Sequence, residues 1–432
     1  MRNSRLLSAL RGNVSVPGDK SISHRAVMFG SIAQGNTRVS GFLPGADCLS
    51  TIGCFRSMGI DIEQDGTRVL VRGRGMRGLK QPGTVLDCGN SGTTMRLMSG
   101  ILSAQAFSCT LTGDASIQKR PMKRIIEPLS GMGADIRSIP GNGCAPLSVS
   151  GRPLHGTSWE SSVASAQVKS AILLAGLYAD GTTSVTEPSL SRDHTERMLS
   201  SFGASVTTAC LPDGRPRISV SRTEELFASD ITVPGDISSA VYFIAAGLMV
   251  PGSEILIKNV GINPTRDGVI EACRLMGAEP KLIPNGHEND PEPAADLLIR
   301  HRPLHGAVIG GGLIPRMIDE LPTVAAMACM AEGETVIRDA AELRVKESDR
   351  IRVMTDALTS MGADVTATED GMIIRGGRPL HGARIETHGD HRIAMTFAVM
   401  DLVAEGAVTL DDPGCAAVSY PDFYGDLRAL FR

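Results

Sequence analysis

Clusters of basic and small polar residues recur at the starts of segments with helical character. The first is Lys20-Ser21-Ile22-Ser23-His24-Arg25. The others are Asn90-Ser91-Gly92-Thr93-Thr94, Ser165-Ala166-Gln167, Asp236-Ile237-Ser238-Ser239, Asp319-Glu320 and Asp390-His391-Arg392. Ser, Asp and Asn are ordinary helix caps, but capping requires no cation such as Lys20 or Arg392. Because a helix N-terminus presents free N–H groups and partial positive charge, these clusters predict a receptor for phosphate or carboxylate groups.

The elements that must position these clusters repeat six times. Each repeat has an apolar helix-like run, a short turn and a strand-like run. The helix-like runs are Ala26–Ala33, Met95–Ala104, Ala171–Ala179, Val241–Val250, Val324–Ala331 and Ala394–Ala404. A second helix follows, and in five repeats it ends at a glycine after Met or Phe, which predicts a left-handed C-cap. Six βαβαββ-like repeats, three per domain, predict an α/β protein with two domains.

Further charged residues open the second helices. They are Lys119-Arg120, Arg192-Asp193-His194, Thr265-Arg266-Asp267 and Arg344–Arg350. In the last segment, Lys346 and Arg350 are four residues apart, so they are expected on one helix face, with Glu347 beside them. Such a run is usually a solvated helix face, but its repeat position is that of Arg120 and Arg192. An anion-binding function is therefore favoured.

Composition excludes several classes of protein. The net charge of −4 argues against a nucleic-acid partner. The nine cysteines contain no CxxC pair and predict neither a disulfide framework nor a zinc site. The basic N-terminus has too short an apolar run for a signal peptide, and no apolar run is long enough for a membrane span. Asp19 interrupts a Walker-like Gly-Lys pair, so no nucleotide cofactor is expected. His388-Gly389-Asp390-His391 has no partner cluster, so no metal is expected either.

Four motifs together resemble the signatures of the 5-enolpyruvylshikimate-3-phosphate synthase family. They are Lys20–Arg25, Gly89–Thr93, Lys346–Arg350 and Asp390–Arg392. The resemblance spans the whole chain. It implies a two-domain inside-out α/β barrel of the enolpyruvyl transferase type, with the active site in a cleft between the domains. The implied domains are residues 18–231, and residues 1–17 with 232–432.

The implied activity is that of a cofactor-free, cytoplasmic, monomeric transferase of the shikimate pathway, which leads to chorismate and aromatic amino acids. It would transfer the enolpyruvyl (1-carboxyvinyl) group of phosphoenolpyruvate to the 5-hydroxyl of shikimate 3-phosphate through a tetrahedral intermediate, releasing phosphate. The two ligands bear two phosphates and two carboxylates, which suit arginine forks and lysine point charges.

The resemblance also implies the roles of individual residues. Shikimate 3-phosphate would be bound by Lys20, Ser21, Arg25, Ser165, Ala166, Gln167, Arg192, Asp319 and Lys346. Phosphoenolpyruvate would be bound by Lys20, Asn90, Gly92, Arg120, Gln167, Arg350 and Arg392. Asp319 is expected to act as the base and Glu347 as the acid, with Lys20 assisting. An ordinary helix cap is the alternative role for Asp319.

Other segments resemble the second class of this family, whose members often tolerate the inhibitor glyphosate. They are Gly18–Ser21, Ser165–Lys169, Arg192–Glu196 and Asn263–Arg266. Val418 stands where many first-class members have a lysine that binds phosphoenolpyruvate, so that contact is not expected here. Gly92 stands where a tolerant member has Ala, whose methyl group would crowd the longer inhibitor. Glyphosate is therefore expected as an inhibitor, and tolerance is a hypothesis.

Two alternatives remain open at this point. UDP-N-acetylglucosamine enolpyruvyl transferase shares the six-repeat fold, but it uses a loop cysteine as acid in an Arg-Cys-Pro-like setting. Neither Cys109 nor Cys144 has such a setting. A non-enzymatic anion-binding protein would need the basic clusters, but not Asp319 and Glu347, whose negative charges would weaken its affinity.

Overall fold

The computed structural model describes residues 9–285 and 291–431, and these residues form two compact domains. The first is Gly18–Val233, and the second combines the chain up to Pro17 with the chain from Pro234 onward. The second boundary lies two residues beyond the expected one. The boundary is shifted because strand β13 (Ile231–Thr232) pairs in parallel with Val39 and Ser40 and so completes a sheet of the first domain. Residues 1–8 belong to the N-terminal segment in which no signal peptide is expected, and they lie outside the described residues.

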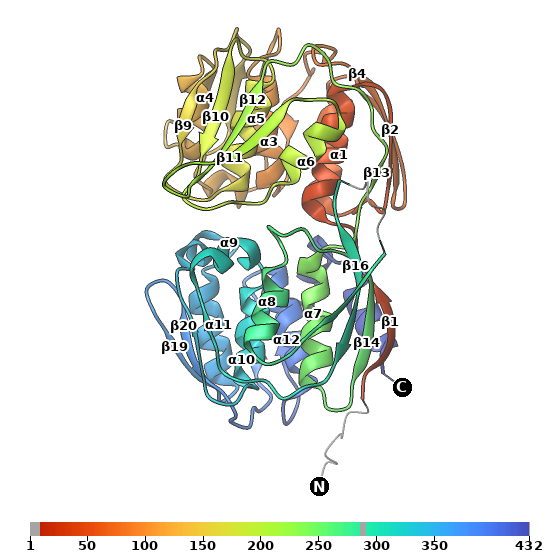
Figure 1. Cartoon of the computed structure of the whole chain (residues 1–432), viewed down its shortest axis with the longest axis vertical. Helices are drawn as coiled ribbons and strands as arrows, with labels where there is room; N and C mark the ends of the chain where they lie inside the picture. The colour runs from red at the N-terminus through yellow and green to blue at the C-terminus, as the bar shows by residue number, and fades with distance from the viewer. Residues whose placement is uncertain (1–8, 286–290, 432) are drawn as a thin grey trace. The chain divides into compact units, whose positions relative to one another are not determined.

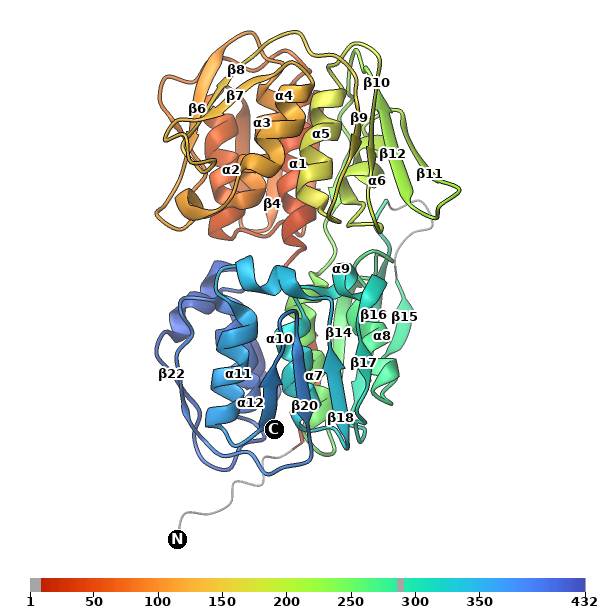
Figure 2. The ribbon, with the colours of Figure 1, turned by 90° about the vertical axis from the view of Figure 1, so that its left-hand side faces the viewer.

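The helices at the centre of each domain can be followed in Figures 1 and 2. In the first domain they are α1 (Lys20–Ile32), α3 (Gly92–Leu102) and α5 (Ala166–Gly176). In the second domain they are α7 (Ile237–Met249), α10 (Leu321–Cys329) and α12 (His391–Met400). Every residue of α7 and α10 is buried. Helices that are apolar all round must lie inside a core, so the sheets lie outside them and the predicted inside-out arrangement is confirmed.

Within the described residues, five sheets have four strands and share one pattern. The first two strands are parallel, and each later strand is antiparallel to its neighbour. The sheets of the first domain, in spatial order, are β13 with β2 (Gln34–Ser40), β4 (Arg68–Arg74) and β3 (Asp61–Asp65); β5 (Leu86–Asp87), β6 (Ser108–Thr112), β8 (Leu147–Ser150) and β7 (Asp135–Ser138); and β9 (Ser158–Glu160), β10 (Thr182–Thr186), β12 (Pro216–Ser221) and β11 (Val206–Cys210).

The second domain follows the same pattern in its first two sheets. These are β1 (Arg11–Ser15), β14 (Glu254–Gly261), β16 (Ala294–Arg300) and β15 (Lys281–Pro284); and β17 (Val308–Ile309), β18 (Glu334–Ile337), β20 (Met372–Arg375) and β19 (Asp364–Ala367). The last repeat keeps only the parallel pair β21 (Arg384–Ile385) and β22 (Thr409–Leu410), followed by the 3-10 helix η4 (Pro413–Val418) and α13 (Phe423–Ala429). The N-terminal strand β1 thus opens the fourth repeat, in the place that β13 takes in the first.

A second helix packs in five of the repeats. These helices are α2 (Ala46–Ser57), α4 (Lys123–Gly131), α6 (His194–Ser201), α8 (Gly268–Leu275) and α11 (Arg350–Ser360). Each ends at a glycine with positive φ, for example 83° at Gly59 and 88° at Gly362, as predicted for left-handed C-caps. The sequence Arg-Pro-Leu-His-Gly occurs three times, and its histidines, His155, His305 and His381, lie against Gly133, Gly277 and Gly362. This supports a structural role for these histidines.

Each domain has its own apolar core, built around its central helices. Among the described helices, none combines the length and the apolar character needed to cross a membrane.

A close approach between α3 and α5, at Gly100, gives a test of this packing. A Cβ atom at Gly100 would lie 2.2 Å from the carbonyl oxygen of Ala171. We expect Gly100→Ala to lower the free energy of unfolding by about 1–3 kcal/mol, because neither helix backbone can move aside easily. Urea unfolding followed by circular dichroism measures the change.

Gly53→Ala is the matched control. Gly53 lies in α2, and an added Cβ would meet nothing within 4 Å. Here we expect stability to rise by up to about 1 kcal/mol, the ordinary gain of Ala over Gly within a helix. Equal shifts in the two variants would contradict the close packing of α3 on α5.

Candidate active site

The start of α1 places Lys20 in the first helical turn of the first domain. The Asp19 side chain caps this helix by accepting the N–H of Ile22 at 2.9 Å. The Nζ atom of Lys20 lies 3.3 Å from Oδ2 of Asp47, and both side chains are partly exposed. Lys20 and the neighbouring Ser21 are therefore accessible to a ligand at the end of the helix.

The start of α3 brings Asn90 and Arg120 together. Oδ1 of Asn90 accepts from Nη2 of Arg120 at 2.6 Å, and its Nδ2 donates to Asp114 at 2.9 Å. Arg120 directly follows the 3-10 helix η1 (Ile117–Lys119). The polar start of α3 is thus in contact with Arg120, which precedes the second helix of this repeat, α4.

Sequence reasoning missed Arg96 as a member of the site. Arg96 is buried and donates through Nη1 to Oε1 of Gln167, while Nε2 of Gln167 donates to Oγ1 of Thr93 at 3.0 Å. A Cβ atom at Gly92 would lie 2.8 Å from Nη1 of Arg96 and 3.7 Å from Nη1 of Arg120. The only signal in the sequence is the four-residue spacing from Gly92, which puts Arg96 one turn further along the same helix face.

The starts of α5 and α6 hold the other predicted ligands of the first domain. Ser165 precedes α5, Ala166 is its first residue, and the Ser165 N–H donates to Oε1 of Glu187 at 3.0 Å. Arg192 stands two residues before α6 and is partly exposed.

Arg25 differs from Lys20, Arg120 and Arg192 because its side chain is buried. It is 2% exposed and donates to Oγ1 of Thr195 (2.7 Å) and Oγ of Ser170 (2.9 Å). It therefore joins α1 to α5 and α6, whatever else it contacts.

Asp319 is the centre of the predicted residues in the second domain. It lies in the turn between α9 (Ile314–Met317) and α10, and its side chain is 15% exposed. Its carboxylate is close to three cations: Nη1 of Arg350 at 3.4 Å, Nζ of Lys346 at 3.7 Å and Nη2 of Arg392 at 3.9 Å. The residue that precedes α10 is Glu320, so the alternative role of Asp319 as the cap of this helix is wrong.

Arg350 binds carboxylates from three parts of the second domain. Its side chain is 1% exposed, and its Nη2 donates to Oε2 of Glu347 at 2.7 Å. Its Nε donates to Oδ2 of Asp390 at 2.8 Å. Asp390, the first residue of the Asp390–Arg392 motif, is fully buried, orients this guanidinium and also caps α12, a role that sequence reasoning missed.

The expectation that Lys346 and Arg350 share a helix face is wrong. Helix α11 begins only at Arg350, because the Asp349 side chain accepts the N–H of Arg352 at 3.1 Å and caps the helix there. Lys346 directly follows the 3-10 helix η3 (Ala341–Val345), and Glu347 lies in the loop between the two helices. The loop nevertheless brings Lys346 and Arg350 to the same carboxylate of Asp319.

Electrostatics keep these buried groups charged. Burial alone would lower the pKa of Arg392, but Asp319 and neighbouring anionic groups raise it above its ordinary value. Burial alone would raise the pKa of Asp390, but Arg350 holds it below its ordinary value. The second domain therefore presents a fixed set of cations with carboxylates among them, an arrangement that can bind anions and accept a proton beside them.

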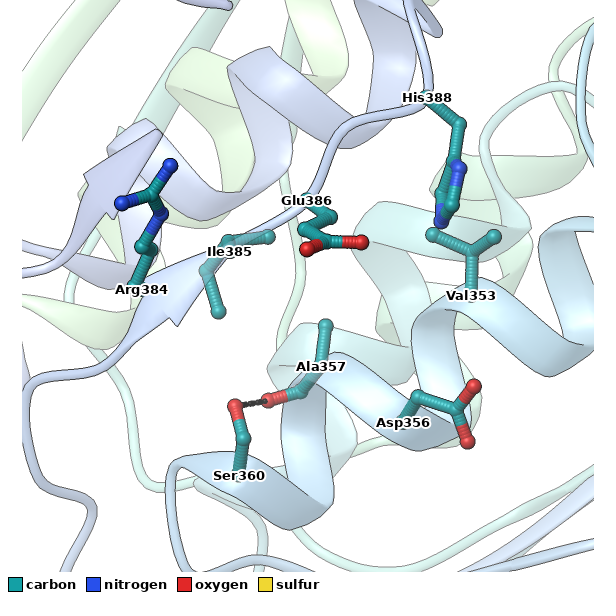
Figure 3. A pocket seen from close by; sticks show the side chains of 8 residues that line it. All are labelled: Val353, Asp356, Ala357, Ser360, Arg384, Ile385, Glu386 and His388. Carbon is teal, nitrogen blue, oxygen red and sulfur yellow. Dashed lines mark hydrogen bonds between the residues drawn. The ribbon is translucent and has the colours of Figure 1, made fainter. Parts of the chain in front are cut away.

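A hollow of about 220 Å³ lies elsewhere on the second domain (Figure 3). It is lined by Val353, Asp356, Ala357, Ser360, Arg384, Ile385, Glu386 and His388. The charged side chains around it are of both signs, and none of the predicted site residues lines it. We assign it no role in the chemistry.

Comparisons with known proteins agree with the geometry. The family model for EPSP synthase (3-phosphoshikimate 1-carboxyvinyltransferase) matches residues 5–427. The 3-phosphoshikimate 1-carboxyvinyltransferase of Geobacillus kaustophilus is 54% identical over 98% of each chain, and that of Geotalea uraniireducens is 54% identical over 98% of this chain and 97% of its own.

Solved structures give the same answer. The EPSP synthase of Acinetobacter baumannii superposes with a TM-score of 0.88 and 48% identity, over 98% of this chain and 96% of its own. The enolpyruvyl transferase NikO of Streptomyces tendae has a TM-score of 0.78 at 18% identity, over 98% and 95% of the chains, and this likeness supports the fold alone. The chain therefore belongs to the EPSP synthase (3-phosphoshikimate 1-carboxyvinyltransferase) family.

Proposed function

We propose that this chain transfers the 1-carboxyvinyl group of phosphoenolpyruvate to the 5-hydroxyl of shikimate 3-phosphate, with release of phosphate, in the shikimate pathway. Family membership and the names of its relatives support the reaction. The observation that carries the proposal is the carboxylate of Asp319 among Lys346, Arg350 and Arg392. The cytoplasmic location and the monomeric state stay predictions from the sequence.

Asp319 suits the role of base. Its side chain is partly exposed, so a substrate hydroxyl can reach it. The three cations around it attract the phosphate and carboxylate groups of the ligands, and this places the hydroxyl near a carboxylate that can take its proton. A site built only to bind anions would gain affinity by losing this negative charge.

The proton transfers of the reaction balance with two carboxylates. Asp319, as the carboxylate, takes the proton of the 5-hydroxyl while the hydroxyl oxygen bonds to C2 of phosphoenolpyruvate. Glu347, which must start as the neutral carboxyl group, donates its proton to the C3 methylene group. The adduct then loses a proton from C3 back to Glu347 as the C2–O bond to phosphate breaks. Lys20 assists these proton transfers. The hydroxyl proton passes from Asp319 to the released phosphate.

The proposed binding residues follow the charges of the two ligands. We assign shikimate 3-phosphate to Lys20, Ser21, Arg25, Ser165, Ala166, Gln167, Arg192, Asp319 and Lys346. We assign phosphoenolpyruvate to Lys20, Asn90, Gly92, Arg120, Gln167, Arg350 and Arg392. Arg25 and Arg350 also hold neighbouring helices, which is compatible with ligand contact because a guanidinium has five N–H donors.

Phosphate release tests the proposal directly. With purified protein, we expect phosphate to be released when shikimate 3-phosphate and phosphoenolpyruvate are both present, and background release when either is omitted. Absence of release with both substrates present would overturn the proposed function.

Asp319→Asn tests the assigned base. The amide has almost the same size but cannot take the hydroxyl proton, so we expect kcat to fall by about 10²–10⁴-fold with the fold retained. Asp356→Asn, at an exposed position of α11 in the same domain, is the control and should keep its activity. If Asp319→Asn turned over at the wild-type rate, Asp319 would not be the base.

Gly92→Ala tests the assigned phosphoenolpyruvate contact. The added methyl group would approach Arg96 and Arg120, so it should intrude on any ligand bound between these arginines. We expect glyphosate, as the longer ligand, to lose affinity by a larger factor than phosphoenolpyruvate does in its KM. Inhibition constants and KM values measured for both proteins check this, and an unchanged ratio would place Gly92 outside the inhibitor contact.

A further inference from the structure

A buried ion cluster lies between α5 and α6 in the first domain. Its cation is Lys169 on α5, whose side chain is 0% exposed. Nζ of Lys169 lies 2.6 Å from Oε1 of Glu196 on α6 and 3.2 Å from Oε2 of Glu187, which directly follows β10. Nζ also donates to the carbonyl oxygen of Ser191 at 3.2 Å.

The cluster is held together by charge. Burial alone would lower the pKa of Lys169, but Glu196 and Glu187 raise it, so the ammonium stays charged. Burial raises the pKa of Glu196, and the positive charge of Lys169 opposes this rise. Apolar side chains of similar size often stabilise a core as well as such a buried ion cluster does. What the ions add is a fixed geometry, since each charge must stay within reach of its partner.

That geometry reaches two segments to which we assigned substrate contacts. Oε1 of Glu187 accepts the N–H of Ser165, directly before α5, at 3.0 Å. The same carboxylate accepts the Oγ–H of Ser191 at 2.8 Å, and Ser191 precedes Arg192 in the chain. Lys169 and Glu187 together therefore tie the Ser165 segment to the Arg192 segment.

A second buried contact extends the connection to α1. Oγ of Ser170, next to Lys169, accepts from Nη2 of Arg25 at 2.9 Å, and Oγ1 of Thr195, next to Glu196, accepts from Nε of Arg25 at 2.7 Å. The hydroxyls of Ser170 and Thr195 lie 2.6 Å apart. Helices α1, α5 and α6, which lie together in this domain (Figure 1), are thus joined near the ends that carry the assigned ligands.

We propose that Lys169 is a positioning residue for shikimate 3-phosphate: it touches no substrate, but it fixes the spacing between Ser165 and Arg192 that the phosphorylated ligand requires. This inference rests on the proposed function. A displacement of about 1 Å at a binding group costs up to about 10²-fold in activity, so loss of the cation should act through these two segments.

A double variant tests the role. Lys169→Met alone would remove the cation but leave Glu187 and Glu196 facing each other, which puts the fold at risk. Lys169→Met combined with Glu196→Gln removes one charge of each sign and leaves the net charge of the cluster unchanged. We expect the double variant to keep the circular dichroism spectrum of the wild type with a lower thermal midpoint, because the buried Glu187 loses the cation that faced it.

The double variant should bind shikimate 3-phosphate about tenfold more weakly by calorimetry, and its KM for this substrate should rise in parallel. At saturating substrate its kcat should stay within about threefold of wild type, because no group that acts on protons has changed. Lys80→Met, at an exposed lysine of the same domain, is the control for the loss of a positive charge and should leave both quantities unchanged.

The failures of the two proposals are distinguishable. A wild-type protein that neither binds shikimate 3-phosphate nor releases phosphate overturns the proposed function. An active wild type with unchanged affinity in the double variant overturns the role of Lys169. An unfolded double variant also overturns it, because the cluster would then serve stability rather than positioning.

Discussion

The buried charge of Arg350 is the constraint on which the second domain's site depends. A guanidinium with 1% of its surface exposed is stable only where carboxylates surround it. Asp390 from the start of α12, Glu347 from the loop before α11 and Asp319 from the turn before α10 supply them. Because one rigid fork contacts all three, the starts of three helices are held at fixed distances. The proposed acid and base are therefore placed by the same side chain.

The inside-out arrangement explains why such charges are needed. The central helices are buried along almost their whole length, and the first N–H groups of each helix have no partner within the helix itself. Side-chain caps such as Asp19 and Ser91 satisfy some of these groups. Lys169 and Arg25 then connect the helix starts in the first domain, as Arg350 does in the second.

Much of this architecture could be predicted from local sequence, because local rules determine it. The six apolar runs became the six central helices, and the glycines after Met or Phe became the C-caps. The start of α11 could not be predicted from the four-residue spacing of Lys346 and Arg350, because the capping hydrogen bond of Asp349 determines where the helix begins. The roles of Arg96, Asp390 and Lys169 depend on partners 71, 40 and 27 residues away. Such pairings follow from the packing of different repeats, which one sequence does not show.

The fourth repeat explains why equivalent helix starts are not all assigned to ligands. Its cation, Arg266, occupies the repeat position of Arg120 and Arg192, but it is 3% exposed. Nη2 of Arg266 donates to Oδ1 of Asp236 at 2.9 Å and to Oγ of Ser238 at 2.8 Å. The anion at this helix start is thus a side chain of the same repeat. A carboxylate partner alone does not make a repeat structural, because Arg350 also contacts Asp390 and is assigned to phosphoenolpyruvate. In the fourth repeat, the polar side chains at the helix start bond to one another, and none of them is among the assigned ligands. Sixfold repetition supplies the helix starts, and the side chains placed at each start determine which of them can take a ligand.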